Sequence, residues 1–252
     1  VAQEDEELLS SLLRQYYGAD RVIPPQVLLP MPLEEAPSIQ ELLTEWRGKK
    51  VLLHAPRRGN KKKLVEMAIK NAREIFRLRE SREEMLRSAL EELQQKLRLR
   101  QCPARIECYD ISTLMGGLAV GSMVVFQNGK PAPGEYRRYR IKSLSDMDDF
   151  GMMREVLLRR LAPKTGRPLL PHLMIIDGGK GQLNVALDVL NQKGLKGIDV
   201  VGIAKAQPGE KGKEEERIYI PGRKNPLHFS RHSKGLHVLQ LLRDEAHRFA
   251  LA

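Results

Sequence analysis

Cysteine and long apolar runs are the two features that this sequence has least of. Among its 252 residues only Cys102 and Cys108 carry thiols, too few for a disulfide framework or a zinc site of four thiolates. We expect both thiols to be reduced and buried, which fits a cytoplasmic protein. No apolar run approaches the roughly 18–20 residues that a membrane-spanning helix needs, and residues 1–7 are acidic and lack the pattern of a signal peptide. The sequence therefore argues against a membrane protein and against a disulfide-rich secreted one.

Positive charge, by contrast, is plentiful. Lysine and arginine number 43 against 32 aspartates and glutamates, which gives a formal net charge of +11. Such a balance favours a polyanionic partner, either nucleic acid or an anionic membrane surface. A basic protein without such a partner is the plain alternative, because net charge describes association rather than fold.

The first hundred residues predict a small α/β segment and a long helix. Leucines at helical spacing predict a helix over 4–17, and short extended stretches follow at 27–29 and 49–54. From residue 61 to 98, apolar residues recur in steps of three and four, which predicts a helix with one break near Ser81. We therefore expect residues 1–59 to form a partial α/β segment, for which a degenerate nuclease-like domain is one interpretation. Residues 60–100 are expected to form a long connecting helix.

The remainder, residues 101–252, predicts an α/β domain with a mixed sheet flanked by helices. Three strands come first, with an Asn128-Gly129 turn between the second and the third, and a short hairpin precedes the last helix. The strands are expected at 105–112, 118–126, 135–142, 172–177 and 200–204, and the helices at 148–161, 181–191 and from 234 onward. This order is that of the RNase H-like fold, and a fold by itself does not assign a function.

Two aspartates occupy positions where a carboxylate is costly unless it is paired or metal-bound. Alternation along a strand places Ile106, Cys108 and Asp110 on one face, so Asp110 ends an otherwise apolar face. Asp177 follows an apolar stretch at the carboxyl end of a buried strand, where α/β sheets place their ligand sites. If the two strands are neighbours, the carboxylates converge, and such a pair suits Mg²⁺ or Mn²⁺ and phosphodiester hydrolysis. The alternative for either aspartate alone is a structural strand-end or helix-cap residue.

Two further segments are expected near these acids. The glycines of DGGKGQ lack the spacing of a P-loop or of GxGxxG, so we interpret them as allowing close backbone approach, with Lys180 near an anion. On the last helix, a helical wheel predicts a buried stripe that includes Leu239 and Leu242. Arg243 and His247 lie on the flank of that stripe, where a helix meets the rim of a site. A structural role is the alternative for this histidine.

Longer motifs resemble the C-terminal nuclease region of the UvrC family. In chain order they are ECYDIS, GSMVVFQNG, YRRYRIK, DDFGMMREVLLRR, LMIIDGGKGQLNVA, GIAK and RDEAHRFA. Two earlier stretches, LLRQYYGADRVIPPQVLLP and KLVEMAIKNA, resemble the segment that precedes this region in the family. The resemblance therefore covers nearly the whole chain. It implies an RNase H-like endonuclease that makes the cut 5′ to a lesion in nucleotide excision repair.

The resemblance also implies roles for single residues. Asp110 and Asp177 are implied as catalytic acids that hold the metal, and His247 as the third member of the constellation. Asp149 of the DDF motif is implied as a further catalytic acid, with Asp148 as the alternative. The implied cofactor is Mg²⁺ or Mn²⁺.

The implied partners are damaged double-stranded DNA and, in the full-length protein, UvrB. We expect UvrB to bind through a segment that this chain lacks, and we do not expect a membrane partner. The family's module for the 3′ cut and its helix-hairpin-helix module are likewise expected to lie outside the chain.

Basic residues on and around the third strand complete the expected site. We expect DNA binding by Arg137, Arg138, Arg140, Lys142, Lys180 and Arg243, with Arg159 and Arg160 adding to the basic surface. The leading hypothesis is a metal-dependent DNA endonuclease. In it, metal-activated water attacks the phosphodiester, and His247 either completes the site or relays a proton.

Two other classes of function are weighed against this one. A non-catalytic DNA-binding platform is disfavoured because Asp110, Asp177 and His247 are all present. A phosphate-binding metabolic enzyme is disfavoured by the lack of a nucleotide fingerprint and by the basic charge.

Overall fold

The structure of the protein is a computed structural model, which describes residues 2–18, 21–114, 118–141, 149–162, 169–205 and 216–251. The chain divides into two compact units, Val1–Ser81 and Arg82–Ala252. No helix in the described ranges is both long and apolar enough to cross a membrane.

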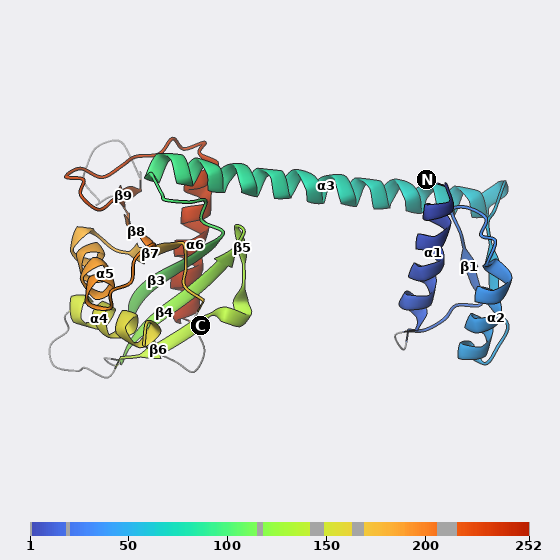
Figure 1. The fold of residues 1–252 in the computed structure, drawn as a ribbon, viewed down its shortest axis with the longest axis horizontal. Helices are drawn as coiled ribbons and strands as arrows, with labels where there is room; N and C mark the ends of the chain where they lie inside the picture. The colour runs from blue at the N-terminus through green and yellow to red at the C-terminus, as the bar shows by residue number, and fades with distance from the viewer. Residues whose placement is uncertain are drawn as a thin grey trace. The chain divides into compact units, whose positions relative to one another are not determined.

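The first unit is built around a βαβ arrangement (Figure 1). Helix α1 (Ala2–Tyr17) is followed by β1 (Gln26–Leu28), α2 (Ala36–Arg47) and β2 (Leu52–His54), and the two strands pair in parallel. The core contains Leu13, Ile39, Leu43 and Val51, of which the last three are fully buried. Helix α2 was not predicted, although Pro37 at its start and Gly48 in the left-handed conformation at its end are typical helix boundaries.

Helix α3 (Gly59–Leu97) is one continuous helix of 39 residues. The predicted break near Ser81 is wrong, because that residue and its neighbours are helical. Only the last part of the helix is buried, through Ala89, Leu90, Leu93 and Leu97. These residues join the core of the second unit.

A seven-stranded mixed sheet forms the centre of the second unit (Figure 1). Its strands are β3 (Arg105–Leu114), β4 (Leu118–Gln127), β5 (Lys130–Pro131), β6 (Arg137–Arg140), β7 (Leu173–Asp177), β8 (Asp199–Ala204) and β9 (Arg217–Tyr219). The order is β5-β4-β3-β7-β8-β9, and β6 also pairs with β4. The pairs β3–β7 and β7–β8 are parallel, while β3–β4 and β8–β9 are antiparallel. A 3₁₀ turn, Pro133–Glu135, precedes β6.

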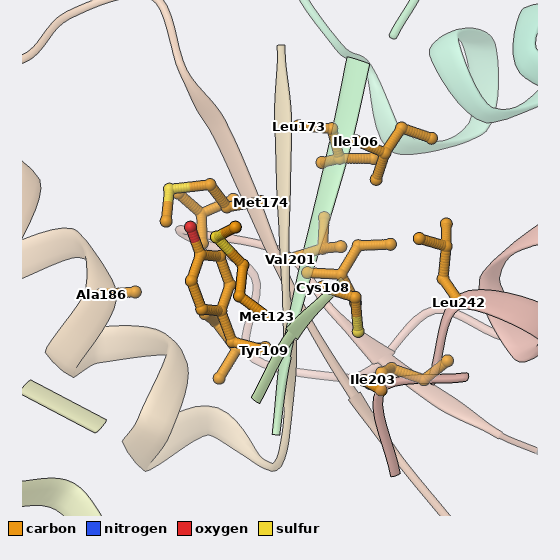
Figure 2. Packing of buried hydrophobic residues seen from close by; sticks show 14 of the residues in the cluster. Ile106, Cys108, Tyr109, Met123, Leu173, Met174, Ala186, Val201, Ile203 and Leu242 are labelled. Atoms are coloured by element: carbon orange, nitrogen blue, oxygen red, sulfur yellow. The ribbon is translucent and has the colours of Figure 1, made fainter. Parts of the chain in front are cut away.

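Helices cover both faces of this sheet. Helix α6 (Lys234–Leu251) contacts β3 and β4, whereas α5 (Lys180–Gln192) contacts β7 and β8 and packs on α4 (Asp149–Arg160). Figure 2 shows Cys108 on the side of Leu242 of α6 and Tyr109 on the side of Ala186 of α5. The predicted mixed sheet flanked by helices is therefore confirmed.

The two cysteines differ in environment. Cys108 is buried, as predicted, and burial raises the pKa of its thiol well above the usual value. Cys102 is exposed. The prediction that it is buried is wrong, because the residue lies in the connection between α3 and β3 rather than in the strand.

Candidate active site

Asp110 and Asp177 lie side by side where the parallel pairing of β3 and β7 ends: Asp177 is the last residue of β7, and β3 continues past Asp110 to Leu114. Tyr109 of β3 is the Cα partner of Ile176 of β7, and each aspartate follows directly. Because paired residues of neighbouring strands point to the same face, both carboxylates lie on the face that α6 covers. Asp110 is only 7% exposed, and Asp177 is partly buried.

The Asp110 carboxylate has two polar neighbours. The hydroxyl of Ser112 donates a hydrogen bond to Asp110 Oδ2 at 2.8 Å. His247 Nδ1 lies 3.3 Å from the same oxygen, while the imidazole side chain is 59% exposed. The structure thus places a solvent-accessible histidine against the more buried of the two acids.

A buried hydrogen bond fixes the α6 backbone next to His247. Ser122 of β4 is the Cα partner of Asp110 and is fully buried. Its hydroxyl donates to the carbonyl of Ala246, the residue before His247, at 2.9 Å. The predicted stripe residues Leu239 and Leu242 are fully buried beneath the same helix. Apolar packing and one polar contact therefore hold the histidine above Asp110.

The charges at the site are not balanced within the protein. Burial, and then the negative charge of Asp110, raise the pKa of Asp177 from 3.8 to about 7. Arg243, His247 and Lys205 act in the opposite direction, with a smaller effect. Two carboxylates in this position repel each other, so an added cation would be stabilised between them.

The residues present suit a divalent cation of the magnesium type. Within the described ranges, no group of three or more histidine, cysteine, aspartate or glutamate side chains is arranged to hold a metal. The protein therefore offers the pair Asp110 and Asp177. Mg²⁺ is commonly held by one or two carboxylates together with waters and substrate phosphates. The raised pKa of Asp177 shows that the negative charge of this pair is not neutralised by the protein, as expected for carboxylates that bind such a cation.

The glycine-rich segment after β7 packs closely against its surroundings. Gly178 has a φ of +157°, and a Cβ there would lie 1.5 Å from Oε1 of Gln182, which accepts a hydrogen bond from the amide of Gly179. A Cβ on Gly202 of β8 would lie 2.9 Å from the carbonyl oxygen of Gly178. Close backbone approach is therefore found at Gly202, whose neighbour is the Gly178 carbonyl, whereas a Cβ on Gly179 would meet nothing within 4 Å. Lys180 is exposed at the first position of α5.

Asp149 is not in contact with the two acids. It is the exposed first residue of α4, and among the described residues no hydrogen bond or ion pair joins it to Asp110 or Asp177. Its neighbour Phe150 packs on Gly181 of α5, since a Cβ on that glycine would lie 2.5 Å from the ring. The start of α4 thus lies beside the start of α5. Asp148 is outside the described residues.

The expected DNA-binding residues fall into two groups. Arg137, Arg138 and Arg140 are exposed, and the guanidinium of Arg138 lies 4.4 Å from the centre of the Phe249 ring on α6. Arg138 also donates to the carbonyl of Phe249 at 2.9 Å. Lys142 lies outside the described residues.

Arg243 and Arg160 do not belong to a basic surface. Arg243 is 7% exposed and pairs with Glu216 and Asp244. Arg160 is 9% exposed and pairs with Glu107. The expectation that Arg160 adds to an exposed basic surface is wrong, because Glu107, 53 residues away in the sequence, binds it in the interior. Arg243 is likewise bound in the interior by Glu216, 27 residues away.

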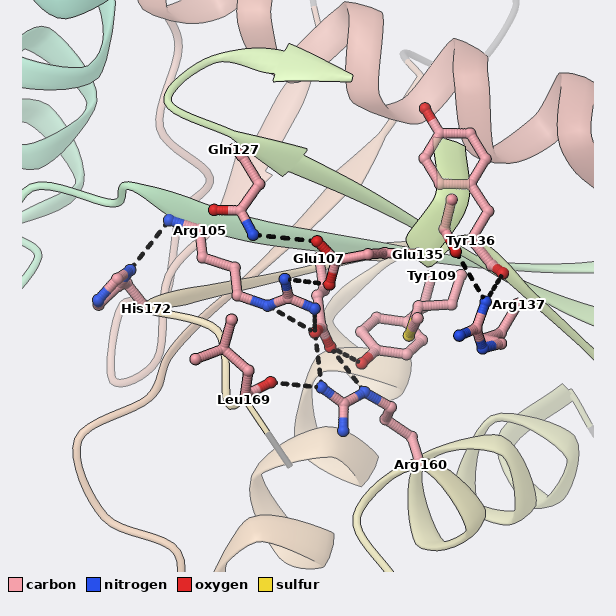
Figure 3. Close-up of polar contacts among 12 residues, drawn as sticks. Arg105, Glu107, Tyr109, Gln127, Glu135, Tyr136, Arg137, Arg160, Leu169 and His172 are labelled. Atoms are coloured by element: carbon pink, nitrogen blue, oxygen red, sulfur yellow. Dashed lines mark hydrogen bonds and ion pairs between the residues drawn. The ribbon is translucent and has the colours of Figure 1, made fainter. Parts of the chain in front are cut away.

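A second polar cluster lies on the opposite face of the sheet (Figure 3). Glu107 is fully buried and accepts hydrogen bonds from Arg105, Arg160 and the hydroxyl of Tyr109. Arg105 reaches Glu135 as well, at 2.6 Å. Sequence inspection missed this cluster, in which every charged group has a partner. It ties β3 to the end of α4.

Lys205 is a site residue that the sequence analysis did not single out. It follows the apolar strand β8 directly, just as Asp177 ends the apolar strand β7. The signal in the sequence is VVGIAK, in which a lysine follows an apolar strand.

Comparisons with known proteins agree on one family. Residues 94–251 match the family model "UvrC RNAse H endonuclease domain", and residues 1–79 match "UvrC Ribonuclease H-like domain". The chain is 47% identical over 255 residues to UvrABC system protein C of Syntrophotalea carbinolica, covering 98% of this chain and 42% of that protein. The protein of the same name from Desulfatibacillum aliphaticivorans is 45% identical, with coverage of 100% and 42%. The chain thus spans about two fifths of the length of these relatives.

Solved structures give a weaker similarity. Endonuclease V of Ciona intestinalis, solved with a DNA that contains inosine, is 13% identical, with a TM-score of 0.35. The match covers 71% of this chain and 96% of that one. A similarity at this level carries no argument about function.

Proposed function

Since the chain belongs to the UvrC family, we propose that it carries the endonuclease site that makes the 5′ incision beside a DNA lesion in nucleotide excision repair. One observation supports this most strongly. Two aspartates follow the last pair of two parallel strands side by side, and a histidine from another element touches one of them. Residues 101–252 would form the nuclease domain, with 1–59 a separate α/β segment and 60–100 the connecting helix.

The two carboxylates would hold Mg²⁺ or Mn²⁺. A cation held there supplies positive charge for the scissile phosphate and favours ionisation of the attacking water. Asp110 is oriented for this task by the hydrogen bond from Ser112. Asp177, whose pKa is raised while the pair is uncompensated, provides the second negative charge.

His247 would transfer a proton to the leaving 3′ oxygen. Its Nδ1 faces Asp110, so Nε2 is the ring nitrogen left to meet the substrate. The contact between Nδ1 and the Asp110 carboxylate orients the ring for this role. The bond from Ser122 to the α6 backbone keeps the ring in place.

Damaged double-stranded DNA is the proposed substrate. The exposed Arg137, Arg138 and Arg140, together with Lys180, would bind its phosphates. Asp149, at the start of α4, is proposed as a further acid that approaches the site when DNA is bound. In the longer protein, UvrB is the proposed protein partner, consistent with the name of the relatives.

The test is 5′ incision of a lesion-containing duplex by the full-length protein with UvrA and UvrB. Asp110→Asn and Asp177→Asn keep the side-chain shape and remove a charge, so we expect incision to fall at least about a thousandfold while DNA affinity stays within about twofold. Asp188→Asn is the matched control, because Asp188 is exposed on α5 and pairs only with Arg154 in the described residues. Substantial cutting by either site variant would contradict the proposal and favour a non-catalytic DNA-binding platform.

A further inference from the structure

Lys205 lies at the same edge of the sheet as the two aspartates. Ile203 of β8 is the Cα partner of Asp177 of β7. Lys205 comes two residues later, directly after the end of β8. Continuing the strand by this one residue places it about 7 Å further along and on the face of Asp177. Neighbouring strands are about 4.8 Å apart. The lysine backbone is therefore close enough for its long side chain to reach the space in front of the carboxylates.

The ammonium of Lys205 is exposed at the end of the described stretch 169–205. The side chain is exposed, and it makes no hydrogen bond or ion pair with any other described residue. Its charge nevertheless reaches the site, because it is one of three cations that oppose the raised pKa of Asp177. The other two are already engaged: Arg243 is buried against Glu216 and Asp244, and His247 faces Asp110.

A phosphate needs such a charge in this position. Two carboxylates repel a phosphodiester, and at ~4 Å a pair of like charges near a protein surface costs several kcal/mol. A divalent cation between the carboxylates offsets part of that repulsion. A lysine beside them adds a point charge for phosphate, and its flexible stem lets it follow the phosphate as charge develops on the oxygens.

We propose that Lys205 is a catalytic residue that contacts a non-bridging oxygen of the scissile phosphate. This inference rests on the proposed endonuclease function. It differs from the proposed role of the β6 arginines, which hold the DNA without contacting the reacting group. Lys205 should therefore affect the rate of cutting by bound enzyme, whereas those arginines should affect binding.

The test compares Lys205→Ala, Lys205→Arg and a matched control in the full-length protein with its repair partners. Lys196→Ala is the control, because Lys196 is also exposed and precedes β8 at the opposite end of the strand. Single-turnover incision at saturating protein separates the cutting rate from affinity. We expect Lys205→Ala to cut about a hundredfold more slowly, as when one donor to a developing charge is removed. DNA affinity should stay within about threefold, and the control should match the parent protein.

Charge and fold are checked in the same series. Lys205→Arg keeps the positive charge and should cut at least about tenfold faster than Lys205→Ala. Thermal unfolding of the three variants should coincide, since both lysines are exposed. The inference is overturned if Lys205→Ala cuts as fast as Lys196→Ala, if saturating protein restores its rate, or if the arginine and alanine variants are equally slow. Asp110→Asn is assayed in the same series. If Asp110→Asn still cuts, the proposed function is wrong. If Asp110→Asn is inactive but Lys205→Ala cuts normally, only the inference about Lys205 is overturned.

Discussion

Replacing Asp177 with asparagine should stabilise the protein increasingly as the pH rises from about 4, with the full effect above about 7. The pKa of Asp177 is about 7 in the folded protein against 3.8 for an ordinary aspartate. Between these values the folded state holds a proton that the unfolded chain has released, so the free energy of unfolding falls as the pH rises. At about 1.4 kcal/mol per pH unit, the interval corresponds to at most about 4 kcal/mol. Because Asp177 is partly exposed to water, we expect about 2 kcal/mol.

Asp177→Asn removes this penalty because an amide does not ionise. At pH 8 with a chelator present, the variant should be about 2 kcal/mol more stable than the parent, and the difference should vanish near pH 4. Urea unfolding followed by far-UV circular dichroism measures it; the single tryptophan, Trp46, lies in the other unit and is a poor probe. Asp188→Asn should show no such pH dependence. A variant that is less stable at pH 8, or equally shifted at all pH values, would refute the reasoning.

Three further outcomes are expected. Ser122→Ala removes a buried donor, so it should cost about 1–3 kcal/mol of stability and slow incision through a loosened His247, with DNA affinity unchanged in a filter-binding assay. Glu107→Gln leaves the buried Arg105 and Arg160 without their shared charge, so urea unfolding should show a loss of about 3–5 kcal/mol; a neutral result would mean that the arginines find other partners. DNA binding should weaken steeply between low and physiological salt, and salt-independent binding would exclude phosphate contacts as its source.

Strand positions in the second unit could be predicted because their periodicity is strong. Alternation in RIECYDIS placed Asp110 on the apolar face, and the position of Asp177 after a buried strand placed it at the same edge. Both predictions depend on local pattern and on the rule that α/β sheets place ligand sites at the carboxyl ends of their parallel strands. In the first unit the proline-punctuated sequence concealed α2, whose buried Ile39 and Leu43 are four residues apart.

Side-chain partners could not be predicted because they depend on contacts between distant segments. A helical wheel assigns Arg243 to a flank, but it cannot show that Glu216 lies there to bind it. Likewise, nothing local in the sequence indicates that Glu107 would collect two arginines in the interior. Arg243, which was expected to bind DNA, instead pairs with Glu216. Glu107, for which no role was predicted, pairs with Arg105 and Arg160.

The most direct test of the proposed metal site is anomalous diffraction from a DNA-free crystal soaked in Mn²⁺. The pair Asp110 and Asp177 carries about −2 when ionised, against +4 for two ions held ~4 Å apart. Without a DNA phosphate the site should therefore hold one ion, with oxygens of Asp110 among its ligands. We expect a single peak beside the two carboxylates, lost in a crystal of Asp110→Asn. An ion bound elsewhere, or no ion at this pair at saturating Mn²⁺ and pH 8, would contradict the proposal that these aspartates form the catalytic metal site.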